Sequence, residues 1–399
     1  MGAGMQIKKL GDVCDFINRG ISPKYIEKNG LIVINQKCIR DHKINFDLAR
    51  FHDCKSKKVS EEKLIQIGDG LVNSTGTGTL GRVALVKELP VQATVDSHVT
   101  ILRPIRGIFD ENFFGYCLVS IEKEIEKLGD GCGGQIELSR NTLKNDVKIS
   151  YPENKDDQLR IVKILDSAFE SINKARAAAE RNLNNVDSLF NSYLASILIS
   201  PKDSWKRKTL KEVADVFGRG KSKHRPRNDK RLFDGQYPFI QTGDVRNSSH
   251  IIDKYTQTYN DVGMAQSKLW PKGTVCITIA ANIAETGILG FEACFPDSII
   301  GIVPNPNETN SDFIEYLLQS FRSVIQAKGK GAAQKNINLA TFENELFQFP
   351  SVKEQGAIVE KLNYLSKETK KVKTIYQKKM AALDELKKSI LNKAFSGEL

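Results

Sequence analysis

KKLGDVCDFINRGIS at residues 8–22 has a second copy, KTLKEVADVFGRGKS, at residues 208–222. Leu, Val, Asp, Arg, Gly and Ser recur at matching positions of the two copies. A duplicated chain folds into two similar units related by a pseudo-two-fold axis, and such a protein tends to act on a target that is itself two-fold. The repeat therefore predicts two like domains and a paired target.

The repeat extends along most of the chain. Three further blocks match in the same order, residues 34–40 with 240–246, 113–120 with 313–320, and 157–162 with 354–359. The offset between the copies changes from 200 to 206 and then to 197, which places small insertions in loops. Because this period is far too long for a solenoid, it indicates duplication of a whole domain with an appended helix.

Each copy begins with a mixed domain. Short β-rich runs separated by Gly, Asn and Asp predict strands across residues 5–152 and again across residues 207–350. One stretch of helical spacing stands late in each domain, at residues 113–128 and 313–326. We therefore expect two α+β domains.

A long helical pattern follows each domain, at residues 161–193 and 358–390. Apolar residues at sustained 3-4 spacing predict that the two helices pair with each other as a coiled coil. Polar Asn182 and Lys379 occupy equivalent positions of the predicted seam and would fix its register. The alternative is that each helix packs on its own domain.

The length of these helices suggests that they set the distance between the two domains. Roughly 35 to 40 residues at about 1.5 Å each make a rod of roughly 55 Å. That length is on the order of 16 base pairs of duplex DNA. The helices would hold two DNA-reading domains at a fixed separation between two half-sites.

Composition narrows the class of protein. The chain of 399 residues carries a net charge of +11, which favours a polyanionic partner, most often nucleic acid. No run of 18 apolar residues and no signal-peptide pattern occurs, so no membrane span is expected. The seven cysteines include no C-x-x-C pair, which fits a reducing compartment and a cytoplasmic location.

A dense cationic cluster follows the second copy of the opening motif. Seven cations fall within thirteen residues, namely Arg219, Lys221, Lys223, Arg225, Arg227, Lys230 and Arg231. Without apolar periodicity the stretch indicates a loop, and so many like charges favour nearby phosphates. The alternative is a salt-bridged or solvated surface.

The candidate catalytic and metal-binding motifs lack the flanking structure or the spacing that such sites require. Residues 76–81 match G-x-G-x-x-G, but a strand follows where a dinucleotide site needs a helix, so a β-hairpin turn is the better interpretation. The possible zinc ligands Cys38, His42, His52 and Cys54 match no reliable spacing. No nucleophile, paired-acid or methyl-transfer motif occurs either, so we expect no catalytic residue, bound cofactor or metal in this chain.

Four stretches together resemble the specificity subunit of type I restriction-modification systems. These are the repeated Lys-x-Leu-(x)₂-Val-x-Asp opening, FIQTGDV at residues 239–245, Pro-(x)₃-Glu-Gln-(x)₂-Ile-Val at 350–359, and KAFSGEL at 393–399. The resemblance implies an α+β chain with two target-recognition domains and two long helices that form an antiparallel coiled coil. The domains would span residues 1–152 and 201–350, and the helical regions residues 153–200 and 351–399.

The resemblance also implies partners. The chain would read a bipartite double-stranded DNA target and do no chemistry. Two modification subunits carrying S-adenosylmethionine would methylate adenine, and restriction subunits with ATP and Mg²⁺ would translocate and cleave. The first copy departs from the pattern, because NQKC stands at residues 35–38 where the second has QTGD at 241–244.

We expect DNA contacts from both copies. The recurring pairs Arg19 with Arg219 and Arg40 with Arg246 would contact phosphates or guanine edges, and Lys221, Lys223, Arg225 and Arg227 would hold phosphates. Gln241 and Thr242 complete the predicted DNA-binding set. Asn73, Ser74, Thr75, Gln135 and Gln334 are loop polars that could read bases or make turns, and turns are favoured for the first three.

Two other functions stay open. The chain could be a self-contained DNA-modifying enzyme with an unrecognised site, or a coiled-coil adaptor with no nucleic-acid role. Methyl transfer by the chain alone would favour the first, and duplex binding that ignores salt would favour the second.

Overall fold

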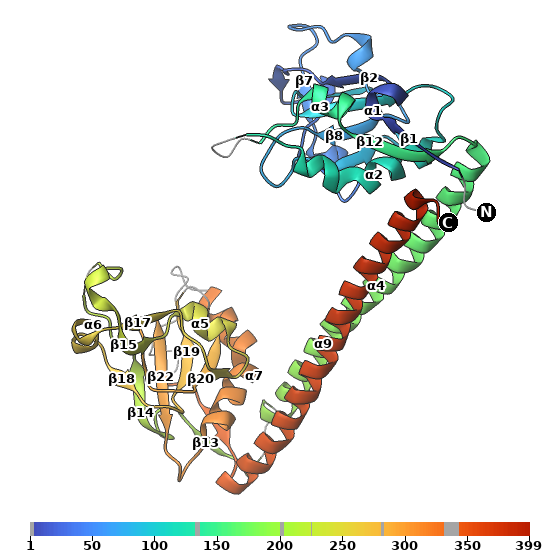
Figure 1. The fold of residues 1–399 in the computed structure, drawn as a ribbon. Helices are drawn as coiled ribbons and strands as arrows, with labels where there is room; N and C mark the ends of the chain where they lie inside the picture. Colours follow the sequence, from blue (N-terminus) through green and yellow to red (C-terminus); the bar gives the residue numbers. More distant parts are fainter. Residues whose placement is uncertain (1–3, 132–135, 200–202, 225, 281–282, 331–342) are drawn as a thin grey trace. The chain divides into compact units, whose positions relative to one another are not determined.

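The computed structural model of the protein describes all residues except 1–3, 132–135, 200–202, 225, 281–282 and 331–342 (Figure 1). The chain divides into two compact units. One comprises Met1–Ala179 with Lys378–Leu399, and the other Glu180–Gln377. Each unit therefore contains one α+β domain and parts of both long helices. The four domain limits drawn from the sequence stay predictions.

The first domain is built on an antiparallel sheet. Its strands lie in the order β2 (Cys14–Arg19), β11 (Val99–Pro104), β8 (Gly70–Asn73) and β9 (Val83–Leu85). A second sheet has the order β10 (Ala93–Val95), β4 (Leu31–Ile34), β7 (Arg50–His52) and β3 (Tyr25–Ile26), with β10 and β4 parallel. Two further pairs are β1 (Met5–Lys9) with β12 (Lys148–Pro152) and the hairpin β5 (Ile39–Arg40) with β6 (Lys43–Ile44). The helices are α1 (Leu10–Val13), α2 (Glu111–Lys127) and α3 (Arg140–Asn145).

The second domain repeats this plan. Strands β14 (Ala214–Arg219), β22 (Ile299–Pro304), β19 (Val275–Thr278) and β20 (Thr286–Leu289) lie in the order of their first-domain counterparts, and β16 (Ile251–Ile252) extends the sheet. The second sheet has the order β17 (Gln257–Tyr259), β15 (Phe233–Phe239), β21 (Ala293–Cys294) and β18 (Leu269–Trp270). β13 (Lys206–Lys208) pairs with β23 (Phe347–Phe349), and the helices are α5 (Thr242–Asn247), α6 (Asp261–Ala265) and α7 (Ser311–Lys330). The predicted duplication is thus confirmed by the strand order of the main sheet.

Helices α2 and α7 begin in the same way. The Asp110 carboxylate accepts hydrogen bonds from the backbone N–H groups of Asn112 and Phe113, at 3.0 and 3.1 Å, and so caps α2. Asn310 Oδ1 accepts one from the Phe313 N–H at 2.9 Å at the start of α7. Behind each cap an apolar face packs on the main sheet, and Phe113 and Phe313 are both fully buried.

A buried glutamine explains the repeated Gln158 and Gln355. Gln158 accepts a hydrogen bond from the Asp110 N–H at 2.8 Å and donates to the carbonyl groups of Ile108 and Pro152. Gln355 makes the same pattern in the second domain, accepting from the Thr309 hydroxyl at 2.8 Å and donating to the carbonyls of Glu308 and Pro350. Each amide ties the start of a long helix to the loop before α2 or α7.

The long helices α4 (Lys155–Leu198) and α9 (Val352–Ser396) pair with each other, as predicted, in antiparallel directions. Partner numbers on α9 fall as those on α4 rise. Arg176 pairs with Asp384 in one unit, and in the other Asn182 donates to the Tyr376 hydroxyl at 3.2 Å and Asp187 pairs with Lys373. Among the described residues, the helices lack the continuous apolar stretch that a membrane span requires.

The long helices also pack on the domains, so the two interpretations drawn from the sequence are not exclusive. The Phe169 ring of α4 meets Tyr116 edge-on, with centroids 5.7 Å apart. The C-terminal KAFSGEL motif docks on the first domain, because Ala394 is fully buried and the Phe395 ring lies 5.5 Å from that of Phe113. Arg160 donates to the Leu399 carbonyl at 3.0 Å.

The predicted seam is wrong by one residue in places. Leu189 is 74% exposed, Leu386 is 47% exposed and Lys379 is exposed, whereas Asn182 is exposed but still contacts Tyr376 of α9. The half-buried positions are instead Leu183, Phe190 and Met380. A strict seven-residue repeat and a helix of 3.6 residues per turn drift apart, and several apolar residues stand beside the assumed seam, so the sequence pattern permits both frames.

Candidate nucleic-acid interface

A cavity with a polar rim opens at one end of the second domain's strands. It has a volume of about 380 Å³, and its lining includes Arg227, Gln241, Thr242, Gln257 and Ser298. Gln241 follows β15, and Ser298 directly precedes β22. Residues that end different strands are therefore gathered at one edge of the domain.

The amide groups in this cavity are held in defined positions. Gln241 Nε2 donates to Gln257 Oε1 at 2.5 Å, which joins the end of β15 to β17. The Gln241 N–H donates to Asp244 Oδ2 at 2.8 Å, and the two residues form a capping box at the start of α5. The helix start thus fixes the backbone of the residue that presents the amide.

Aromatic rings form the apolar floor of the cavity. The ring of Phe239 stacks on Tyr259 with centroids 4.0 Å apart, and Phe233 lies against both. Phe239 and Tyr259 are buried. A rigid apolar floor with an amide rim can hold a planar polar group such as a base edge.

The cationic loop beside the cavity is braced by acidic groups. The Arg227 guanidinium contacts both Asp297 carboxylate oxygens, at 2.6 and 2.9 Å, with both side chains nearly half exposed. Asp229 accepts from Arg231 and lies 2.8 Å from His224 Nε2. Hydrogen bonds from the Arg231 side chain and backbone, and then from His224, lower the pKa of the Asp229 carboxyl. Arg227 and Arg231 are therefore positioned by ion pairs, although they are exposed like Arg219, Lys221 and Lys223.

The first domain gathers different polar groups at the matching positions. Gln36 and His98 align with Thr242 and Ser298 in the repeat. The Thr75 hydroxyl lies 2.7 Å from His98 Nδ1 and donates to Gln36 Oε1 at 3.4 Å. Both domains thus carry a polar cluster at the same edge of the sheet, built from unlike residues.

Comparison with known proteins identifies the family. The model of the type I restriction modification DNA specificity domain matches residues 3–180 and again residues 202–378. The chain belongs to this family.

The whole chain resembles whole specificity subunits. It is 23% identical over 413 residues to a putative type I restriction enzyme MjaX specificity subunit of Methanocaldococcus jannaschii, covering 99% of this chain and 93% of that one. A solved structure, described as the structural basis of complex assembly and conformational transition of the type I R-M system, contains a chain with the same fold, at a TM-score of 0.78. The two chains are 18% identical, and the match covers 99% of this chain and 98% of that one. The HsdS subunit of Thermoanaerobacter tengcongensis matches with a TM-score of 0.58 and 18% identity, over 99% of this chain and 97% of that one.

The family assignment gives the chain a role in recognition. A type I specificity subunit recognises DNA and is not itself an enzyme, and it works with methyltransferase and restriction subunits. Both domains of this chain are DNA specificity domains, as the resemblance to type I specificity subunits implied.

The predicted DNA-binding residues of the specificity subunit are distributed unevenly. Arg227, Gln241 and Thr242 line one cavity. Arg19 pairs with Glu137 and donates to the Leu138 carbonyl at 2.8 Å, so an ion pair engages it. Arg225 lies outside the described residues. None of these contacts tests DNA binding, which stays a prediction for all ten residues.

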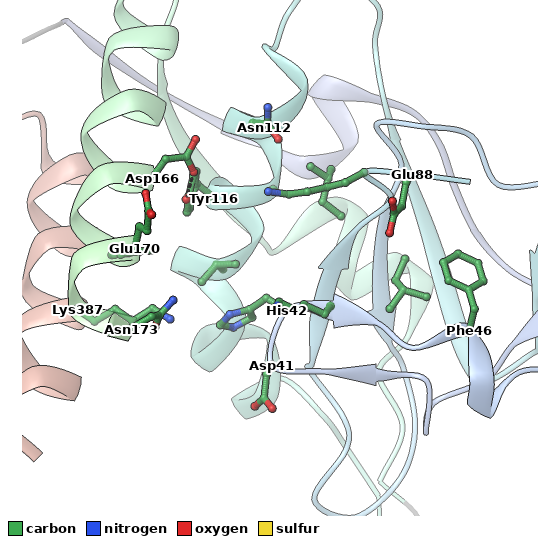
Figure 2. Close-up of a pocket in the computed structure, with 17 residues that line it drawn as sticks. Asp41, His42, Phe46, Glu88, Asn112, Tyr116, Asp166, Glu170, Asn173 and Lys387 are labelled. Atoms are coloured by element: carbon green, nitrogen blue, oxygen red, sulfur yellow. Dashed lines mark hydrogen bonds between the residues drawn. The ribbon is translucent and has the colours of Figure 1, made fainter. Parts of the chain in front are cut away.

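Arg40 and Arg246 occupy unlike structures despite their alignment. Arg40 ends strand β5, whereas Arg246 is exposed in the last turn of α5. The hairpin that follows Arg40 carries Asp41 and His42, which line another pocket of about 640 Å³ between the domain and the long helices (Figure 2). The NQKC and QTGD segments therefore differ in backbone as well as sequence.

The loop polars fall into three groups. Asn73 is the last residue of β8 and Ser74 follows it outside any turn, so the prediction that they form turns is wrong. Thr75 makes an isolated antiparallel bridge with Glu137 rather than a turn. Gln135 and Gln334 lie outside the described residues.

The Gly-rich segment is the predicted β-hairpin connection. It joins the antiparallel strands β8 and β9, and Gly76, Gly78 and Gly81 have positive φ angles. A Cβ on Gly81 would lie 2.9 Å from the Glu126 backbone, so both its φ of 86° and the lack of space call for glycine.

The four residues weighed as zinc ligands have separate environments. His52 is fully buried, with Nδ1 accepting from the Lys24 N–H at 2.9 Å and Nε2 lying 2.8 Å from the Lys57 carbonyl. His42 contacts Glu122, Cys38 is buried and Cys54 is exposed. Among the described residues no group of three His, Cys, Asp or Glu side chains could hold a metal.

Proposed function

We propose that this specificity subunit reads a bipartite duplex, with one domain on each half-site, and leaves all chemistry to its partners. The observation that carries the proposal is the pair of polar clusters at the same edge of two repeated domains. Because Gln36, Thr75 and His98 stand in one cluster and Gln241, Thr242 and Gln257 in the other, the two half-sites would have different sequences.

The side chains of the second cluster suit base edges. A glutamine amide offers a donor and an acceptor side by side, which matches the N6 and N7 groups of adenine in the major groove. Gln241 and Gln257 would exchange their mutual hydrogen bond for contacts with bases. Arg227, Lys221, Lys223 and Arg219 would contact the flanking phosphates and fix the register of the domain.

The long helices would serve two purposes in the complex. They would set the length of the unread gap between the half-sites, and they would dock two modification subunits. S-adenosylmethionine would be bound by those subunits, and ATP with Mg²⁺ by restriction subunits. We place the assembly in the cytoplasm, since seven cysteines without a paired motif suit a reducing compartment.

Sequencing of methylated adenines in the genome of the organism that carries this chain tests the proposal. The expected result is one motif made of two short blocks with a fixed unread gap, which disappears when the gene is deleted. A continuous motif, or a two-block motif that survives the deletion, would overturn it.

Two in vitro controls address the other functions. The purified chain is incubated with S-adenosylmethionine and mixed duplex, and methyl transfer without a partner would identify a self-contained enzyme. Binding to random duplex is then measured from about 50 to 200 mM salt, and a flat response would favour an adaptor without DNA contacts.

A further inference from the structure

The two units carry matching grooves between the domain and the long helices, and these grooves differ in charge. In each, a tyrosine of the domain helix donates to a side chain of the long helix that packs on it. The Tyr116 hydroxyl donates to Asp166 Oδ1 at 2.5 Å, and the Tyr316 hydroxyl donates to Asn363 Oδ1 at 2.7 Å. Asp166 and Asn363 are equivalent in the repeat, so the two hydroxyl contacts mark the same point in both grooves.

The groove of the first unit is lined with acidic groups on its helical side. Asp166, Glu170 and Asn173 follow one another on successive turns of α4, as Figure 2 shows. Lys387 of α9 lies on the same wall, with its ammonium 5.0 Å from the Phe169 ring. Carboxylates and cations are therefore mixed in this groove.

The groove of the second unit is cationic. It has a volume of about 500 Å³ and is lined by His250, Tyr316, Asn363, Ser366, Lys367, Lys370, Lys371 and Thr374, without a carboxylate among them. Lys367 and Lys370 stand where the first groove has Glu170 and Asn173. At three equivalent positions the first groove thus has two carboxylates and one amide, whereas the second groove has one amide and two lysines.

Most of this positive charge is available to a ligand. Lys367, Lys370 and Lys371 are exposed. Lys370 donates to the Ser249 hydroxyl at 3.0 Å, and Lys371 pairs with Glu368. His250 is held between the two carboxylates of Asp312 and Glu315, so this cluster adds no net positive charge and the lysines supply the positive charge of the groove.

A short segment of the chain connects the groove to the proposed base-reading cavity. Gln241 caps α5, which runs through Thr242–Asn247 and leads directly to Ser249 and His250 at the groove. Six helical residues at about 1.5 Å each and three further residues at about 3.3 Å each limit the separation of Gln241 and His250 to roughly 20 Å. The exposed Arg246 lies on this path.

We propose that the lysine groove of the second unit, built from Lys367, Lys370 and Lys371, holds backbone phosphates of duplex DNA beside the half-site read by that domain. Lysine ammonium groups on flexible stems suit phosphates as point charges without fixed geometry. The groove of the first unit, with its mixed carboxylates and cations, makes no such contact, so the two half-sites are held unequally. This inference rests on the proposed function.

The test uses the full chain and a fluorescent duplex of random sequence, about 40 base pairs long, with affinity measured from about 50 to 200 mM KCl. Lys367→Gln/Lys370→Gln is expected to make the negative slope of log affinity against log salt shallower, by about 0.9 for each phosphate that the variant no longer binds. Lys163→Gln/Lys174→Gln is the matched control, because it removes the same charge from α4 in the first unit, and Lys174 is the repeat equivalent of Lys371. The control should keep the wild-type slope.

A second measurement does not depend on variants. Lysine acetylation of the wild-type chain is read by mass spectrometry with and without the duplex, and Lys367 and Lys370 should be protected while Lys174 is not. Equal slopes for the two double variants, or no protection, would overturn the inference. If the lysine variant kept its DNA slope but failed to assemble stably with the modification subunit, the groove would belong to an acidic protein surface. If wild-type binding itself ignored salt, the proposed function would fail instead.

Discussion

His250 shows how a single residue joins distant parts of the second unit. Its Nε2 lies 2.7 Å from Asp312 Oδ1 and its Nδ1 lies 2.8 Å from Glu315 Oε2, while its ring stacks on Tyr316. Glu315 is fully buried and also accepts from the Thr286 hydroxyl. The partners are some sixty residues away along the chain, so the sequence around His250 gives no sign of the network.

Stability should depend on the charge of His250. Burial lowers the pKa of His250, but hydrogen bonds to the Asp312 and Glu315 carboxylates outweigh it and raise the pKa from 6.5 to about 9. A raised pKa means that the contribution is complete below pH 6.5 and is lost as the pH rises through about 9. The loss would be up to about 3 kcal/mol in the free energy of unfolding.

Urea denaturation of the wild type and of His250→Gln, at several pH values from about 6.5 to 9.5, measures this effect. The wild type should lose stability steadily across the range, and the variant should lose much less. Parallel curves for the two proteins would show that the histidine is not the titrating group.

The buried glutamines allow a second test at this scale. Gln355→Leu should leave the Glu308 and Pro350 carbonyls and the Thr309 hydroxyl without their partner, lowering the free energy of unfolding by about 2 to 4 kcal/mol. The exposed Gln377→Leu makes the same chemical change on the same helix and should be nearly neutral. Thermal denaturation compares them, and an equal effect would mean that the buried hydrogen bonds contribute nothing.

At the scale of elements, the long helices were easier to predict than their contact face. Apolar spacing and the lack of proline identify both helices and their pairing, since these signals are local. Where two apolar residues are adjacent in the sequence, the contact face of the helix depends on which of the two packs against the partner helix. Leu189 and Phe190 fit the pattern equally well, and only packing against the partner helix and the domain selects Phe190.

Alanine substitutions at Leu189 and Phe190 distinguish the contact face predicted from the sequence from the one in the structure. Phe190→Ala is expected to lower the free energy of unfolding by about 2 to 3 kcal/mol, because the ring packs on the core of the second unit. Leu189→Ala, at a position 74% exposed, should change it by less than about 0.5 kcal/mol. Chemical denaturation of both variants decides, and a larger loss for Leu189→Ala would restore the frame predicted from the sequence.

The residues of the two polar clusters could be predicted only in part from the sequence. Gln241 and Thr242 stand in a motif that the repeat brings to attention, and Arg227 in a conspicuous cationic run. Gln257, Ser298 and His98 have no local signal, because strand pairing brings them to the site from distant segments. The repeat offset itself would have found His98 and Ser298, since they align with each other at the start of equivalent strands.

At the scale of the whole molecule, duplication is the main result. One strand order, one buried glutamine and one tyrosine contact occur twice, while the polar clusters and the grooves differ between copies. Features that hold the fold are thus shared, and features that would face DNA have diverged. This division is what two domains reading different half-sites would require.

Selection from a random duplex pool by the chain assembled with its modification subunit tests this claim most directly, comparing wild type with Gln241→Ala and Gln36→Ala. The wild type should select two blocks with a fixed gap. Gln241→Ala should relax one block by about 1 to 3 kcal/mol at a position and leave the other intact, and Gln36→Ala should relax only the second block. If both variants weakened the same block, or if either weakened both, the claim that each domain reads its own half-site would be contradicted.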